Sequence, residues 1–185
     1  MRRLDPRSTL VLVIDVQERL APAMPEARVA DLLRGVGILL EGARLLGAPV
    51  LATEQYPKGL GATLPAVAER LDAVGATRIE KMEFSACDVP AFADALTAIQ
   101  PAAVVVVGME THVCVLQTVR DLRARGLEVH VPIDAVASRR DDHRAAGLAL
   151  CERAGAFATT CETIAFDWLA RAGSDPFKAL SKLIR

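Results

Sequence analysis

Three residues of reactive type stand where predicted buried segments end. Asp15 directly follows the apolar run Thr9–Ile14, and Lys81 ends a short strand-like segment. Cys114 follows the apolar run 103–107 and a turn that begins with glycine. A thiol can attack a carbonyl carbon, a carboxylate can accept the thiol proton, and an ammonium can support the developing charge. Together the three residues suit nucleophilic acyl transfer.

Each of these residues also has an ordinary structural interpretation. A carboxylate after a strand can cap a loop, a single lysine is usually solvated, and a cysteine in a helix is usually a small buried apolar side chain. Their shared placement at strand ends favours a functional role over these structural ones. Cys114 also opens a predicted helix, where backbone N–H groups and a nearby ammonium would favour the thiolate and lower the thiol pKa. We expect Cys87, Cys151 and Cys161 to be buried structural residues.

The elements that must position these residues alternate between strand and helix. Continuous apolar runs at 9–14 and 103–107 are typical of strands buried on both faces of a parallel sheet. Further strands are predicted at 50–52, 78–80, 128–133 and 157–159. Helices are predicted at 29–43, 65–71, 90–99, 112–125 and 141–154, and from about 163 and 175. The alternation predicts an α/β fold, a three-layer α/β/α sandwich with a mostly parallel central sheet.

Length and composition limit the class of protein. The chain has 185 residues, which suit one domain over 1–185, and its 52% hydrophobic content excludes a disordered chain. Its formal net charge of -1 provides no global field for nucleic acid or an anionic membrane. No apolar run approaches the roughly 20 residues of a membrane helix. No secretory signal is evident and the four cysteines are scattered, so we expect a cytoplasmic protein.

The sequence resembles the isochorismatase-like cysteine hydrolase family. The resemblance rests on Asp15 in the context Val-Ile-Asp-Val-Gln, the later Lys81, and a Gly-x-x-Thr-x-x-Cys turn from Gly108 to Cys114. It covers nearly the whole chain and implies a six-stranded parallel sheet with helices on both faces. Four segments are similar to the isochorismatase-domain-containing subgroup of that family: 53–59, 80–85, 110–117 and 177–183.

The resemblance implies that Asp15, Lys81 and Cys114 form a catalytic triad. It also implies a non-proline cis peptide between Met109 and Glu110, which aims the backbone N–H groups of Glu110 and Cys114 at an oxyanion. In the implied cycle, Asp15 takes the thiol proton, Cys114 attacks an amide carbonyl and ammonia leaves. Water then hydrolyses the thioester, and no organic cofactor is required.

Three sequence features separate this chain from other members of the family. Nicotinamidases hold a metal with Asp and His after the second strand, but residues 54–63 contain neither, so we expect no metal. True isochorismatases hydrolyse a vinyl ether without a cysteine nucleophile, so Cys114 disfavours that chemistry. His112 stands where nicotinamidases tend to have Asp, and the sequence does not define its role.

Three further residues are candidate substrate contacts because they lie near the proposed catalytic strand ends. They are Gln17, Tyr56 and Phe84, and ordinary packing is the alternative for each. Only 4% of the residues are aromatic, which predicts a small and mainly aliphatic site. A compact amide fits such a site better than a large conjugate.

The C-terminal segment from Ala172 has apolar residues at helical spacing. They are Phe177, Leu180, Leu183 and Ile184. Because the subgroup commonly self-associates, we expect a homo-oligomer to which this segment contributes. The alternative is that the segment docks on its own subunit.

The leading hypothesis is a cysteine amidohydrolase with a small-molecule substrate. One alternative is an isochorismate-type vinyl-ether hydrolase, in which Asp15 and Lys81 perform acid–base catalysis and Cys114 only lines the pocket. The other is a non-catalytic binding or interaction protein, because a fold alone does not define an activity. Replacing Cys114 with Ala would abolish the first activity and spare the second.

Overall fold

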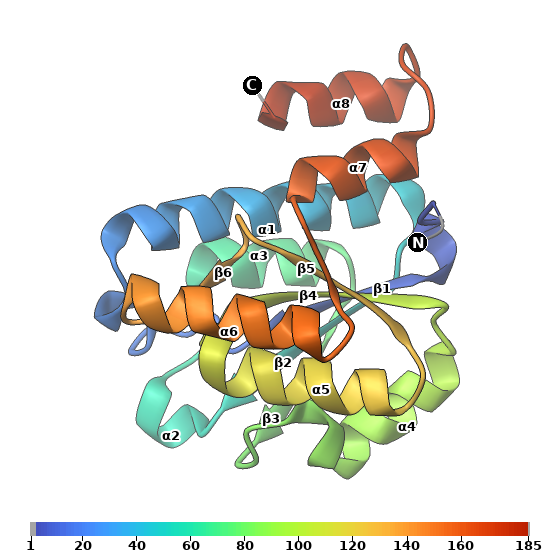
Figure 1. Cartoon of the computed structure of the whole chain (residues 1–185). Helices are drawn as coiled ribbons and strands as arrows, with labels where there is room; N and C mark the ends of the chain where they lie inside the picture. Colours follow the sequence, from blue (N-terminus) through green and yellow to red (C-terminus); the bar gives the residue numbers. More distant parts are fainter. Residues whose placement is uncertain (1–2, 185) are drawn as a thin grey trace.

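A computed structural model describes residues 3–184, and its centre is a parallel sheet (Figure 1). The strand order is β3-β2-β1-β4-β5-β7, with β6 paired to the end of β4, and every strand pair is parallel. The predicted α/β fold with a parallel central sheet is confirmed. The two-residue β6 adds a seventh strand to the six expected. The strands are β1 (Thr9–Ile14), β2 (Val50–Gln55), β3 (Thr77–Lys81), β4 (Ala103–Met109), β5 (Glu128–Pro132), β6 (Val136–Ala137) and β7 (Phe157–Thr159).

Helices cover both faces of the sheet (Figure 1). Residues of α1, α3 and α7 pack on one face, and residues of α4, α5 and α6 pack on the other. A π-helical turn, η4 (Thr111–Val115), joins β4 to α5, and short 3-10 helices occur at 6–8, 21–23 and 86–88. The α-helices are α1 (Glu26–Leu46), α2 (Pro57–Leu60), α3 (Pro65–Ala73), α4 (Pro90–Ile99), α5 (Leu116–Ala124), α6 (Asp141–Arg153), α7 (Cys161–Leu169) and α8 (Asp175–Ile184).

The central strands β1 and β4 are buried on both faces, which explains their continuous apolar sequences. Val11 and Val13 join the core beneath α1, whereas Leu12 and Ile14 join the core above α4 and α5. Burial of each such side chain stabilises the fold by about 1.5–3 kcal/mol. The two cores therefore hold the ends of these strands in place.

Gly108 allows β1 and β4 to meet closely at their carboxyl ends. It pairs with Ile14 and has a φ of 117°, a backbone conformation that side-chain-bearing residues rarely adopt. A Cβ at this position would lie 1.9 Å from the carbonyl oxygen of Ile14. Glycine here thus sets Asp15, which follows Ile14, beside the turn that carries Cys114.

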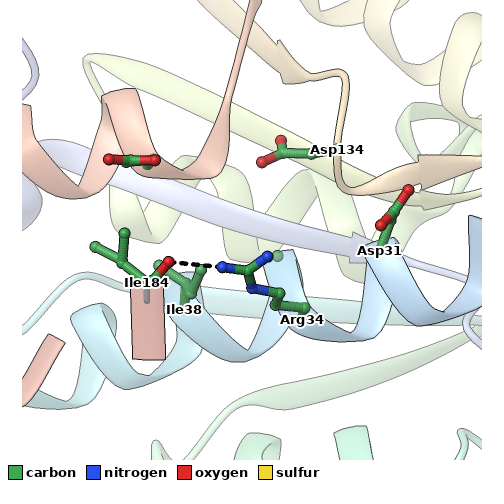
Figure 2. A pocket seen from close by; sticks show the side chains of 7 residues that line it. Asp31, Arg34, Ile38, Asp134 and Ile184 are labelled. Carbon is green, nitrogen blue, oxygen red and sulfur yellow. Dashed lines mark hydrogen bonds between the residues drawn. The ribbon is translucent and has the colours of Figure 1, made fainter. Parts of the chain in front are cut away.

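The C-terminal helix α8 docks on its own subunit. It packs on α1 and α7, and Leu180 is fully buried between them. Arg34 of α1 donates a hydrogen bond to the carbonyl oxygen of Ile184 at 2.6 Å, as Figure 2 shows. Asp134 accepts from the backbone N–H of Cys161 at the start of α7. These polar side chains satisfy backbone groups at helix ends, so the cavity of about 100 Å³ that they border has a structural explanation.

Candidate active site

The structure brings Asp15, Lys81 and Cys114 together at the carboxyl edge of the sheet. Lys81 Nζ lies 2.7 Å from Asp15 Oδ2, and both side chains are fully buried. Cys114 is 6% exposed, its thiol lies 3.9 Å from Gln55 Oε1, and the charges of Asp15 and Lys81 act on it. Asp15 adopts a left-handed backbone conformation with φ 52°, which Asp tolerates better than most residues.

Thr53 supports the carboxylate from the neighbouring strand. Its hydroxyl donates to Asp15 Oδ1 at 2.7 Å, while the Asp15 backbone N–H donates to the Thr53 carbonyl. A buried carboxylate is costly unless its oxygens are satisfied, and here Thr53 and Lys81 take one oxygen each. Sequence reasoning missed Thr53. The parallel β1–β2 register would have identified it, because Thr53 pairs with Ile14, the residue just before Asp15.

The ammonium of Lys81 is held by four acceptors. Besides Asp15, Nζ donates to Gln55 Oε1 at 2.6 Å and lies 3.2 and 3.3 Å from the carbonyl oxygens of Glu83 and Phe84. An ammonium has only three protons, so all of its donors are used inside the protein. Lys81 therefore acts here as a fixed positive charge. Gln55 pairs with Lys81 in the β2–β3 register, and no role was predicted for it from the sequence.

Gln17 lies beneath the site. Its Nε2 donates to the carbonyl oxygens of Gln55 and Gly61 at 3.0 and 2.7 Å, and its Oε1 accepts from the backbone N–H of Gln55 at 2.8 Å. The side chain is fully buried, and backbone groups use both ends of its amide. Gln17 thus supports the end of β2, which differs from the substrate contact suggested by the sequence.

The other two candidate substrate contacts lie at the protein surface beside Lys81. Tyr56 is 47% exposed and Phe84 is 53% exposed, and the neighbouring Met82 is 64% exposed. The backbone N–H of Tyr56 donates to the Lys81 carbonyl, and the Phe84 carbonyl accepts from Lys81 Nζ. Their backbones are therefore anchored to the triad lysine while their side chains remain accessible.

The turn before Cys114 is shaped by its backbone. The Met109–Glu110 peptide bond is cis, and the π-helical turn that follows carries Cys114 into the start of α5. The Glu110 carboxylate accepts from both the backbone N–H and Nε of Arg139, at 3.0 and 3.1 Å. Glu110 thereby ties the turn to the segment between β6 and α6.

Two further contacts hold the same turn from α6 and β6. Thr111 Oγ1 donates to the carbonyl oxygen of Ala137 at 3.0 Å. A Cβ at Gly147 of α6 would lie 2.8 Å from the backbone nitrogen of His112, so only glycine permits this approach. The His112 ring contacts Ser138 Oγ and lies against the His143 ring in a tilted arrangement, and burial lowers the pKa of His112. His112 thus faces the α6 side of the turn.

The Cys114 thiol is protonated in the free protein. Burial and the charge of Asp15 raise its pKa to about 12, and the opposing effect of Lys81 is smaller. The main physical cause is burial, which penalises the charged thiolate, and Lys81 offsets only part of the combined effect of burial and Asp15. The expectation that the helix start and the ammonium favour a resting thiolate is therefore wrong. Burial likewise raises the pKa of Cys87 to about 11 and of Cys151 to about 12.

Comparison with known proteins agrees with this geometry. The isochorismatase domain family matches residues 9–163. Isochorismatase domain-containing protein 2A of Mus musculus is 37% identical over 184 residues, which cover 99% of this chain and 85% of that protein. Secreted isochorismatase effector Isc1 of Phytophthora sojae is 37% identical over 186 residues, with 99% and 87% coverage.

A solved structure shows the same relationship. The MAR1 ribonuclease of Caenorhabditis elegans superposes with a TM-score of 0.91 and 38% sequence identity, over 99% of this chain and 92% of that one. The family match spans well over half of the chain, and the relatives cover nearly all of it. The chain therefore belongs to the isochorismatase family.

Proposed function

We propose that the protein is a cysteine-dependent hydrolase that cleaves the C–N bond of a small amide through a thioester on Cys114. The observation that carries this proposal is the buried Asp15–Lys81 ion pair, whose two charges act on the buried Cys114 thiol. A protonated nucleophile needs a base at the moment of attack, and Asp15 is the proposed base. Lys81 supplies a positive charge that stays in place throughout.

In the first half of the proposed reaction, sulfur bonds to the carbonyl carbon while Asp15 accepts the thiol proton. The carbonyl electron pair moves onto oxygen, where the backbone N–H groups of Glu110 and Cys114 are the proposed donors. When the C–N bond breaks, Asp15 returns the proton to nitrogen and ammonia leaves. Cys114 then carries the acyl group as a thioester.

Water completes the proposed cycle. It attacks the thioester carbon while Asp15 takes one of its protons, and the C–S bond then breaks. Asp15 gives that proton to the departing sulfur, which restores the thiol and releases a carboxylic acid. Lys81 offsets the negative charge as it moves between carboxylate, oxyanion and sulfur.

Two other activities deserve a direct comparison in the assay. A vinyl-ether hydrolase would use Asp15 and Lys81 and would not need the thiol, so a buried thiol on which both charges act favours the amide reaction. The C. elegans relative is described as a ribonuclease. A thiol with a carboxylate base suits an acyl carbon, and a formal net charge of -1 provides no general attraction for RNA.

The test is a screen of small amides for ammonia release, with the mass of the Cys114 peptide followed during turnover. We expect an acyl adduct on Cys114 and no turnover by Cys114→Ala. Cys87→Ala is the matched control, because Cys87 is also buried and lies outside the triad. Isochorismate hydrolysis that survives Cys114→Ala would favour vinyl-ether chemistry, and RNA cleavage that requires the triad would replace the amide proposal.

The location and assembly of the protein stay predictions. Within residues 3–184, none of the helices is both long and apolar enough to cross a bilayer. The four cysteines are free thiols, as a cytoplasmic protein would have, whereas the Phytophthora relative is described as secreted. Cell fractionation tests the location. Light scattering tests the predicted homo-oligomer, whose contacts would have to lie outside the α8 surface already buried within the subunit.

A further inference from the structure

We infer that Gln55 is a positioning residue of this site, whose side-chain oxygen keeps the Cys114 thiol protonated at rest and keeps the Lys81 ammonium directed at Asp15. The inference rests on the proposed role of Cys114 as the nucleophile. It adds a fourth side chain to the triad and assigns it a task that differs from acid–base catalysis.

One oxygen atom of Gln55 contacts two members of the triad. Gln55 Oε1 accepts from Lys81 Nζ at 2.6 Å and lies 3.9 Å from Cys114 Sγ, within the range of an S–H···O hydrogen bond. The nitrogen of the same amide donates to the carbonyl oxygen of Met82 at 2.8 Å. Because that carbonyl can only accept, the amide must place its oxygen toward lysine and sulfur.

The position of Gln55 is fixed by its backbone as well. Gln17 bonds both the N–H and the carbonyl oxygen of Gln55, and Gln55 pairs with Lys81 in the parallel register. The side chain is 8% exposed. The amide is thus held in one orientation. Gln55 Oε1 needs this fixed orientation to accept from both Lys81 and Cys114.

The charges around sulfur give this contact its effect. Asp15 from the end of β1 and Lys81 from β3 are the charged groups that act on Cys114. In the same turn, the Glu110 carboxylate is bound to Arg139, and the His112 ring contacts Ser138. An amide oxygen accepts from S–H and repels S⁻, and by holding Lys81 it also keeps that ammonium away from sulfur. Both effects favour the thiol over the thiolate.

Two substitutions at Gln55 should change thiol reactivity in opposite directions. Gln55→Ala removes the acceptor and frees Lys81 to donate to sulfur, so we expect iodoacetamide to label Cys114 at least threefold faster at pH 8. Gln55→Glu places a negative charge beside sulfur and should make labelling slower than in the native protein. Peptide mass separates Cys114 from the other three cysteines, and the labelling rate is followed from pH 7 to 10.

Controls separate this role from general loosening of the fold. Gln100→Asn is the matched variant, because Gln100 is an exposed residue with φ 49° at the end of α4 and Asn tolerates that conformation. It should label like the native protein. If thermal unfolding shows that Gln55→Ala is not folded, Gln55→Met keeps the volume, lacks the acceptor and should label faster in the same way.

Unchanged or slower labelling of Cys114 in the folded acceptor-free variant would overturn the inference, as would faster labelling in both Gln55→Ala and Gln55→Glu. The labelling rates of Cys114 can be measured without a substrate. If amides are hydrolysed through Cys114 but the Gln55 variants behave alike, the proposed function stands and this inference fails. If the variants diverge as expected but no amide is turned over, the positioning role stands and the amide proposal fails.

Discussion

The two halves of the candidate active site are built by different means. In the half formed by β1, β2 and β3, buried side chains bond one another, with Lys81 joining Asp15 to Gln55. In the half formed by β4, η4 and α6, close packing of the backbone shapes the turn, with glycines at positions 108 and 147. The first half controls charge and the second controls shape, so substitutions in the two halves should fail in different ways.

The difference agrees with what each half would supply under the proposed function. A base must change protonation during a reaction, so its surroundings are side chains whose charges balance. An oxyanion site needs backbone N–H groups held in fixed directions, and packing against a helix achieves this better than flexible side chains do. Arg139 and Glu110 are an exception, because there an ion pair helps to hold a backbone turn.

The largest effect is expected from breaking the buried ion pair. Lys81→Met leaves the Asp15 carboxylate buried without its cation, so the free energy of unfolding should fall by about 3–5 kcal/mol. Urea unfolding measures the loss, and the exposed Lys182→Met should change it by less than about 0.5 kcal/mol. Adding Asp15→Asn to Lys81→Met should recover part of the stability. A loss below about 1 kcal/mol would contradict the charge-balanced description of this half.

A smaller effect is expected from changing the shape of the other half. Gly147→Ala places a Cβ 2.8 Å from the backbone of the turn, which should cost about 1–3 kcal/mol of stability even though Ala favours a helix. Turnover should fall as the turn moves. The exposed neighbour Ala146→Ser serves as the control on the same helix. A more stable Gly147→Ala variant with full activity would show that this close contact is not required.

The ion pair of the shape-controlling half should matter less. Arg139→Ala should lower the free energy of unfolding by at most about 1 kcal/mol, because the Arg139 side chain is largely exposed and its backbone N–H still binds Glu110. We expect a lower kcat with a small change in KM if the pair orients the turn. Arg140→Ala, which removes an exposed pair with Asp142, should leave both constants unchanged. Equal changes of kcat and KM in the two variants would show that Arg139 does not orient the turn.

The smallest effect is a pH dependence that reports the charge balance. The folded-state pKa of Cys114 is raised to about 12, so the unfolded chain loses this proton first as the pH rises. Stability therefore decreases with rising pH, by about 0.4 kcal/mol per buried thiol between pH 8 and 9. Urea unfolding of native protein and Cys114→Ala at both pH values should show a smaller decrease in the variant. An equal decrease would mean that the thiol is not kept protonated by the fold.

Much of the site was predictable because parallel strands end at one edge of the sheet. The runs 9–14 and 103–107 identify the central strands. Asp15 and Cys114 come after these two strands, and Lys81 is the last residue of β3. Thr53 and Gln55 were not assigned, because their roles depend on which residue faces which in the β1–β2 and β2–β3 registers. For Gln17 the sequence allows either a substrate contact or ordinary packing, and its bonds to Gln55 favour the packing role, in support of β2.

The sequence by itself determined the order of six strands and of every α-helix except α2, the family and the three candidate catalytic residues, because apolar periodicity and short motifs are local properties. The tertiary structure decided the protonation of Cys114, the orientation of the Gln55 amide and the docking of α8 on its own subunit. Each of these depends on burial and on partners distant in the chain. The free energy of a buried charge depends on every group around it, so a local sequence pattern cannot predict it.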